Sequence, residues 1–156
     1  KVLIDYNGKK FKSVSDNDLD LGTTEEKEET KKQAEDSKDM FEFMKEALGD
    51  KVTEVKLSSR LKNAPVCISS TGPLSLDMEK VLNAMPQNAD KQVKAQKALE
   101  LNAAHPIFEK LKSLFESDKD MLTKYTKLLY SQALLIEGMS IEDPVELSNM
   151  ICDLMV

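Results

Sequence analysis

Few residues in this sequence could do chemistry. His105 is the only histidine, so neither a histidine pair nor a set of three histidine zinc ligands can form. The glycines stand singly and make neither a GxGxxG nor a GxxxxGK pattern, so no phosphate-binding loop is predicted. Carboxylates are numerous but lie in charged helical stretches, where solvation and ion pairing explain them. We therefore predict no catalytic, cofactor-binding or metal-binding residue, and for His105 a turn and the start of a helix.

The two cysteines, Cys67 and Cys152, stand far apart in the stretches PVCIS and MICDL. Their separation fits neither a CxxC pair nor a disulfide framework. Apolar neighbours favour a buried free thiol at each position over a redox or metal site. Free thiols suit a reducing compartment, so we expect a cytoplasmic protein.

Charge and length narrow the possible partners. The 156 residues include 22 Lys and Arg against 28 Asp and Glu, a net charge of -6, which gives no general attraction to nucleic acid or anionic lipid. No apolar stretch approaches the roughly 18 residues of a membrane span. We expect no nucleic acid and no membrane as partners. The chain begins at Lys1 without a methionine, which suggests a fragment of a longer protein.

The N-terminal part changes composition sharply. Val2 to Ser15 predicts a hairpin around the Asn7-Gly8 pair, followed by a turn-rich connector. One long helix is then predicted from Thr23 to the stop at Gly49. Its first half has no apolar face, which is typical of a solvated charged helix or a fraying linker, and its second half carries the stripe Met40, Phe43, Met44 and Ala47. The change in composition places a domain boundary between Asp16 and about Asp39, and we set it between residues 22 and 23.

Beyond Gly49 the pattern alternates. Val55 and Leu57, then PVCIS and ALELN, predict three short strands. Three strands are too few for a barrel, so the fold class is α+β, a small three-stranded sheet backed by helices. Between the second and third strands an amphipathic helix carries the stripe Met78, Val81, Leu82 and Met85, and a polar run at residues 86–96 predicts a mobile loop.

Three helices are predicted to complete the chain: Pro106 to Phe115, Asp118 to Glu137, and a last one with Asp143 as cap and Glu146 completing a capping box. The last helix carries the stripe Leu147, Met150, Ile151, Leu154 and Met155.

The helix from Asp118 is too apolar for one buried face. The helical period places a broad apolar face at Leu122, Tyr125, Leu128, Leu129, Ala133, Leu135 and Ile136. Tyr130 and Leu134 fall off this face, among polar residues on the expected wet side. Two sides of this helix must therefore be buried. Either the helix lies in the interior of a monomer, or a second copy of the chain covers it in a four-helix bundle with twofold symmetry.

Several segments, taken in order, resemble the C-terminal domain of the ninety-kilodalton heat-shock chaperone family, most closely its bacterial branch. They are YNGKKFKSVSDNDLDLG, VTEVKLSSRLKNAPVCIS, the helix with Met78 and Met85, LELNAAHPI, LLYSQALLIEG and EDP. The chain departs from the family in two places. Ala103 replaces the usual proline after Asn102, so we expect a looser turn, and the ending ICDLMV lacks the acidic tail of eukaryotic cytosolic members.

The resemblance implies a homodimer in which the last two helices of each chain form a four-helix bundle. The apolar positions that we assign to this interface are Leu128, Tyr130, Leu134, Leu135, Leu147, Met150, Ile151, Leu154 and Met155. It also implies that residues 1–22 are either the end of a middle domain or a connector with a hairpin, and that residues 23–156 form the C-terminal dimerisation domain.

The same resemblance implies that Met78, Val81, Leu82 and Met85 contact non-native client proteins, although the stripe alone would suggest core packing. Family members bind ATP and magnesium in an N-terminal domain, so no cofactor and no enzyme activity are expected in these residues. The alternative is an independent helical interaction module with no link to an ATPase; an enzyme is a more distant alternative.

Overall fold

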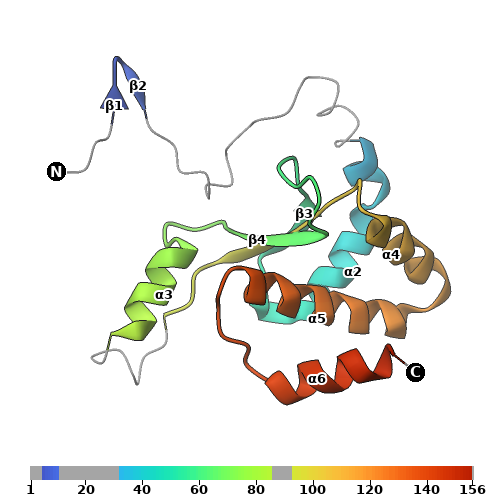
Figure 1. The fold of residues 1–156 in the computed structure, drawn as a ribbon. Helices are drawn as coiled ribbons and strands as arrows, with labels where there is room; N and C mark the ends of the chain where they lie inside the picture. Colours follow the sequence, from blue (N-terminus) through green and yellow to red (C-terminus); the bar gives the residue numbers. More distant parts are fainter. Residues whose placement is uncertain (1–4, 11–31, 86–92, 156) are drawn as a thin grey trace.

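The computed structural model describes residues 5–10, 32–85 and 93–155 (Figure 1). Its first element is a hairpin, in which β1 (Asp5–Tyr6) pairs antiparallel with β2 (Lys9–Lys10). Asn7 and Gly8 connect the strands with φ angles of 50° and 74°, which confirms the predicted turn. The rest of the predicted hairpin, residues 2–4 and 11–15, lies outside the described residues. So do the connector and the boundary at residue 22.

Helix α2 (Lys38–Leu48) supplies the first part of the core and buries Met40, Phe41, Met44 and Leu48. Residues 32–36 are also helical, and the hydrogen bonds from Ser37 N–H to the Gln33 carbonyl and from Phe41 N–H to the Ser37 carbonyl continue the helical pattern across Ser37. Gly49 ends the helix with a φ of 61°, as predicted, and the short 3-10 helix η1 (Gly49–Lys51) follows. Residues 23–31, including the predicted cap at Thr23, lie outside the described residues.

A three-stranded sheet forms the centre of the fold, with strand order β3-β5-β4. β5 (Lys97–Leu101) pairs in parallel with β3 (Glu54–Leu57) and antiparallel with β4 (Val66–Ser70). Leu99 lies opposite both Val55 and Ile68, so one face of the sheet is apolar across all three strands. The predicted α+β class with three strands is confirmed.

Asn102 fixes the loop that precedes β4. The side-chain amide of Asn102 donates hydrogen bonds to the carbonyls of Lys62 (3.1 Å) and Ala64 (2.9 Å), and its side-chain oxygen accepts one from Ala104 N–H (3.0 Å). The His105 N–H donates to the Asn102 carbonyl at 3.1 Å. Asn102 therefore closes the turn by hydrogen bonds, and a looser turn than the proline would give stays a prediction.

His105 caps helix α4 (Pro106–Ser117), as the sequence predicts. Its Nδ1 accepts a hydrogen bond from the Ile107 N–H at 3.2 Å, and Pro106 takes the first helical position. The helix buries Phe108, Leu111 and Leu114.

Helix α5 (Lys119–Ile136) runs beneath the apolar face of the sheet, with α2 and α4 beside it (Figure 1). It buries six side chains: Leu122, Thr126, Leu129, Tyr130, Ala133 and Leu134. Thr126, Tyr130 and Leu134 belong to the side that we predicted to face solvent, and this prediction is wrong because all three are buried. Leu135 and Ile136, from the predicted buried face, are exposed instead. Thr126 tolerates full burial because its hydroxyl donates to the Leu122 carbonyl at 2.8 Å.

Candidate protein-interaction surfaces

Helix α6 (Pro144–Asp153) buries none of its residues within the chain and lies on the side of α5 away from the sheet (Figure 1). Asp143 caps it by accepting hydrogen bonds from the N–H groups of Val145 and Glu146 at 3.0 and 2.8 Å. A capping box also requires the Glu146 carboxylate to bind the Asp143 N–H. This part of the prediction is wrong, because the Glu146 carboxylate pairs instead with Lys127 of α5 at 3.2 Å.

Two ion pairs and a half-buried stripe attach α6 to α5. Lys124 pairs with Asp153 at 3.2 Å, and the Lys127 pair lies toward the other end of α6, so the two helices run antiparallel. The attached side of α6 carries Leu147, Met150 and Leu154, which are half-buried. Ion pairs this exposed are worth at most about 1 kcal/mol each, so they add little to the attachment of α6.

The structure separates the predicted interface residues into three groups. Tyr130 and Leu134 lie in the chain's own core, and Leu128 of α5 is half-buried, like the three α6 residues of the attached stripe. Leu135, Ile151 and Met155 are exposed by 55%, 39% and 80%. Val145 and Ile136 are also exposed, by 69% and 57%, and were not assigned to the interface. These exposed apolar residues of α5 and α6, which the chain itself leaves uncovered, are together called the outer surface.

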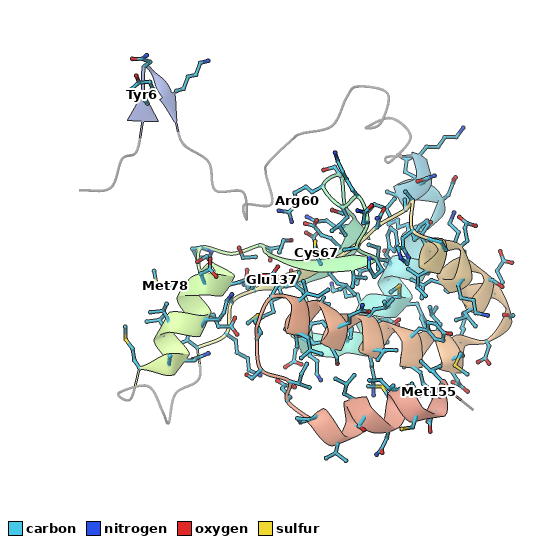
Figure 2. The ribbon with its side chains drawn as sticks, in the orientation of Figure 1. Tyr6, Arg60, Cys67, Met78, Glu137 and Met155 are labelled. Carbon is cyan, nitrogen blue, oxygen red and sulfur yellow. The ribbon has the colours of Figure 1, made fainter. Side chains whose placement is uncertain are left out.

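A second apolar surface lies on helix α3 (Leu76–Ala84), which stands apart from the helices beneath the sheet (Figure 1). Met78, Val81 and Met85 are exposed by 50%, 52% and 40%, and Leu82 is half-buried. Figure 2 shows Met78 on this helix, and Met155 near the end of α6. The structure thus exposes three of the four residues assigned to client contact.

The side of α3 that faces the protein carries one core residue, Leu76, and polar residues beside it. Glu79 accepts hydrogen bonds from the Ala95 N–H at 2.7 Å and from the Lys97 ammonium at 2.6 Å, and both charged side chains are buried. Asn83 donates to the Val93 carbonyl and accepts from the Val93 N–H, both at 2.9 Å. These contacts depend on which residues the fold brings together, and no spacing in the sequence indicated them.

Residues of the connection between α5 and α6 line two open pockets. One, of about 500 Å³, reaches Glu79 and Asn83 of α3, and the other, of about 380 Å³, reaches Glu146 and Met150 of α6. Both are lined by Lys51, Tyr130, Leu134 and Glu142. Glu142 accepts hydrogen bonds from Lys94 (2.9 Å) and Lys51 (3.3 Å), which hold the pKa of Glu142 below its ordinary value. Burial raises the pKa of Tyr130 to about 12, so its phenol stays neutral.

A polar cluster occupies the other face of the sheet around Glu100. Its carboxylate accepts hydrogen bonds from the Ser58 hydroxyl at 2.8 Å and from Arg60 at 3.2 Å, and the Cys67 thiol lies 3.6 Å from it. Cys67 is half-buried, and Figure 2 shows it close to Arg60. Cys152 is exposed on α6, so its predicted burial is wrong within a single chain.

The cluster and the cavities do not suggest metal chemistry. Over residues 5–10, 32–85 and 93–155, His, Cys, Asp and Glu nowhere gather in a group of three or more that could hold a metal ion. In the same ranges no helix is both long enough and apolar enough to cross a membrane. The chemistry that the described surfaces offer is that of protein contact, since their exposed groups are chiefly aliphatic and thioether side chains.

Comparison with known proteins identifies the family. A family model described as "Hsp90 protein" matches residues 1–156, so the chain belongs to the Hsp90 family. Proteins named chaperone protein HtpG are similar to it. That of Clostridium perfringens (strain ATCC 13124) is 57% identical over 155 residues, which are 99% of this chain and 24% of the relative. That of Bacillus subtilis (strain 168) is 49% identical over 156 residues, 100% of this chain and 25% of the relative. The chain thus spans about a quarter of the length of these relatives.

Proposed function

We propose that this chain is the homodimerisation and client-contacting domain, in C-terminal position, of an ATP-dependent molecular chaperone. Family membership over the whole chain supports the chaperone class over the alternative of an independent interaction module. ATP and magnesium would bind in another domain, so the part played here is assembly and contact with clients. The observation that carries the proposal is the outer surface, which the chain's own elements leave uncovered although it is apolar.

The geometry of the outer surface suits a twofold bundle. Leu128 and Leu135 are seven residues apart, two helical turns, and therefore lie on one side of α5. Ile151 and Met155 of α6 are exposed beside the half-buried stripe that touches α5. Two antiparallel helices from each chain, packed with twofold symmetry, would cover both sets of residues at once.

Dimerisation would have a mechanical consequence for the whole chaperone. Two chains joined at one end meet at their other domains in an intramolecular step, at an effective concentration of order millimolar for short flexible links. Weak contacts between the distant ATPase domains could then form or break according to the nucleotide that is bound. The exposed methionines of α3 would offer clients a surface that adapts to varied side chains, because methionine is flexible and polarisable.

Sedimentation equilibrium of the wild-type chain tests the proposal. We expect a homodimer at low micromolar concentration. The ion pairs that attach α6 are exposed, so the measurement should be made at physiological salt. A stable, folded monomer at tens of micromolar would contradict the proposed role of the outer surface.

A further inference from the structure

The connection between α5 and α6, residues 137–143, leads into α6 and helps to set its position. α6 contacts α5 through a half-buried stripe and buries none of its residues fully. Residues 139–143 have no regular secondary structure, and Figure 1 shows the chain leaving the end of α5 and turning back along it into α6. The place of α6 therefore depends on what holds this segment as well as on the stripe.

Backbone hydrogen bonds and packing hold the first part of the connection. Gly138 has a φ of 67°, and the N–H groups of Gly138 and Met139 donate to the carbonyls of Leu135 and Leu134 at 3.0 and 2.9 Å. This is the usual way in which a helix ends at glycine. Met139 and Ile141 then pack against the core, so the path of the chain is fixed as far as Ile141.

The next residue, Glu142, is held by two lysines from other elements. Its Oε1 accepts a hydrogen bond from the Lys94 ammonium at 2.9 Å, and its Oε2 lies 3.3 Å from the Lys51 ammonium. Lys51 is the last residue of η1, and Lys94 precedes β5. Because Asp143, the cap of α6, follows directly, the Glu142 carboxylate ties the start of α6 to two separate parts of the fold.

Packing does not replace these ionic contacts, because both open pockets border Glu142. Lys51, Tyr130 and Leu134 line the two pockets together with it. An exposed ion pair between two charges contributes little, but a network of several charges contributes more. Each Glu142 oxygen has its own lysine, so removing this one carboxylate breaks both contacts at once.

We propose that Glu142 is a positioning residue: by binding Lys51 and Lys94 at once, it holds α6 in the place where Ile151 and Met155 face outward toward a second copy of the chain. The link to dimerisation rests on the proposed function, whereas the holding of α6 by Glu142 does not.

The twofold symmetry of a dimer would amplify the effect. Only chains with α6 in place can pair, so the apparent dissociation constant is divided by the fraction of such chains, once for each partner. A fall of about threefold in that fraction would therefore raise the dissociation constant about ninefold.

Hydrogen exchange in the Ile151→Glu, Met155→Glu background tests the position of α6 without dimerisation. Glutamine has the size of glutamate but only one side-chain oxygen, so Glu142→Gln cannot accept from a lysine on each side. A detached helix of ten residues is only marginally stable. Amide exchange in residues 147–153 should therefore accelerate by about threefold or more, while exchange in residues 122–134 stays within about twofold.

Sedimentation equilibrium in the wild-type background tests the consequence for pairing. Glu142→Gln should raise the dimer dissociation constant about fivefold to tenfold. Lys94→Gln should raise it less, because Lys51 remains bound. Adding Lys94→Gln to Glu142→Gln should change the constant by less than about twofold, since the contact is already lost, whereas independent effects on packing would add.

Two controls separate the contact from the loss of charge. Glu137→Gln removes the same charge from the same connection and keeps the carbonyl to which Lys80 donates at 2.9 Å. Glu109→Gln removes an exposed carboxylate paired with Lys112 on α4. Neither variant should change the exchange of α6 or the dissociation constant.

Unchanged exchange of α6 in Glu142→Gln would overturn the proposal. So would an equal effect of Glu137→Gln, because net charge would then explain the result. In a dimeric chain, an unchanged dissociation constant would overturn the link to pairing. Failure of the proposed function is distinguishable: a wild-type chain that sediments as a monomer refutes the dimer, while selective acceleration of α6 still supports its positioning by Glu142.

Discussion

Glu100 shows how a single charge can lie within the sheet. Burial alone would raise its pKa, but the hydrogen bonds from the Ser58 hydroxyl and the Arg60 guanidinium, with the charge of Arg60, outweigh burial and hold the pKa of Glu100 below its ordinary value of 4.5. The fold therefore stabilises the carboxylate form. The Glu100 carboxylate binds Ser58 and Arg60, so it holds the loop after β3 against β5.

We expect Glu100→Gln to lower the free energy of unfolding by about 1–3 kcal/mol at neutral pH, since a charge-assisted bond to Arg60 is lost. The pKa of Glu100 is lower in the folded chain, so its contribution is present above pH 4.5 and is lost as the pH falls through the folded pKa. The difference between wild type and variant should therefore shrink on acidification, as measured by urea unfolding. A difference independent of pH would contradict the assignment, and Glu109→Gln is the exposed control.

Cys67 should be nearly inert toward thiol reagents. Burial, followed by the nearby charge of Glu100, raises the pKa of Cys67 from 9.0 to about 12, which lowers its thiolate fraction at neutral pH by about a thousandfold. In a Cys152→Ser variant only Cys67 can react, and its alkylation rate in the folded chain should fall far below that of the same variant in urea. Equal rates in the two conditions would show that the thiol is accessible and ionised.

At the scale of single elements, α3 and the helical residues before α2 differ in what holds them. The core residue Leu76 and polar contacts fix α3, whereas the helical residues 32–36 are exposed apart from Ala34, which is half-buried. A helix without a buried stripe depends on propensity and surface ion pairs, each worth about 0.2–0.5 kcal/mol.

We expect the double variant Met78→Ser, Met85→Ser to weaken client holding while the melting temperature stays nearly unchanged. Both side chains are exposed, so their removal leaves no cavity, whereas truncating a core residue costs several kcal/mol. Suppression of aggregation of a denatured substrate measures the first effect, and thermal unfolding measures the second. Substituting Asp77→Asn, on the same helix, is a control that leaves the apolar side intact. A large fall in melting temperature would mean that α3 supports the core.

Residues 32–36 should exchange their amide hydrogens earlier than α5. The rest of the charged first half of the predicted helix, residues 23–31, lies outside the described residues. Hydrogen exchange followed by peptide mapping compares this segment with Leu122 to Leu134, which are central to the core. Equal protection would indicate an additional contact on the exposed side of residues 32–36.

At the scale of the whole molecule, two variants on neighbouring helices should fail in different ways. Leu134 is only 6% exposed, so Leu134→Glu would place an unpaired carboxylate in the chain's own core and should unfold the monomer. Ile151→Glu combined with Met155→Glu changes only exposed residues and should give a folded monomer. Sedimentation together with circular dichroism distinguishes the two results.

Asn149→Glu is the matched control for these variants. Asn149 is exposed and lies on the side of α6 that carries Glu146 and Asp153, at helical spacing from both. It should sediment as the wild type does. Dimers that survive Ile151→Glu with Met155→Glu would show that the outer surface of α6 is not the interface.

The sequence by itself determined the elements and the fold class. The Asn7-Gly8 turn, the stop at Gly49, the cap at His105 and the three strands are local effects, governed by allowed φ angles and by period-two or period-3.6 burial. The exposure of the methionines on α3 could be anticipated only from the family resemblance, because the stripe alone is typical of a core helix.

Tertiary structure decided which side of each apolar helix faces inward. α5 carries apolar residues on nearly every side. Its helical period therefore could not show which pair would be buried, Leu135 and Ile136 or Tyr130 and Leu134. The position of the sheet made that choice, and Thr126 could join the buried side because its hydroxyl is satisfied within the helix. The attachment of Glu79 to Lys97 joins residues from separate elements, and only folding brings such charges within 2.6 Å.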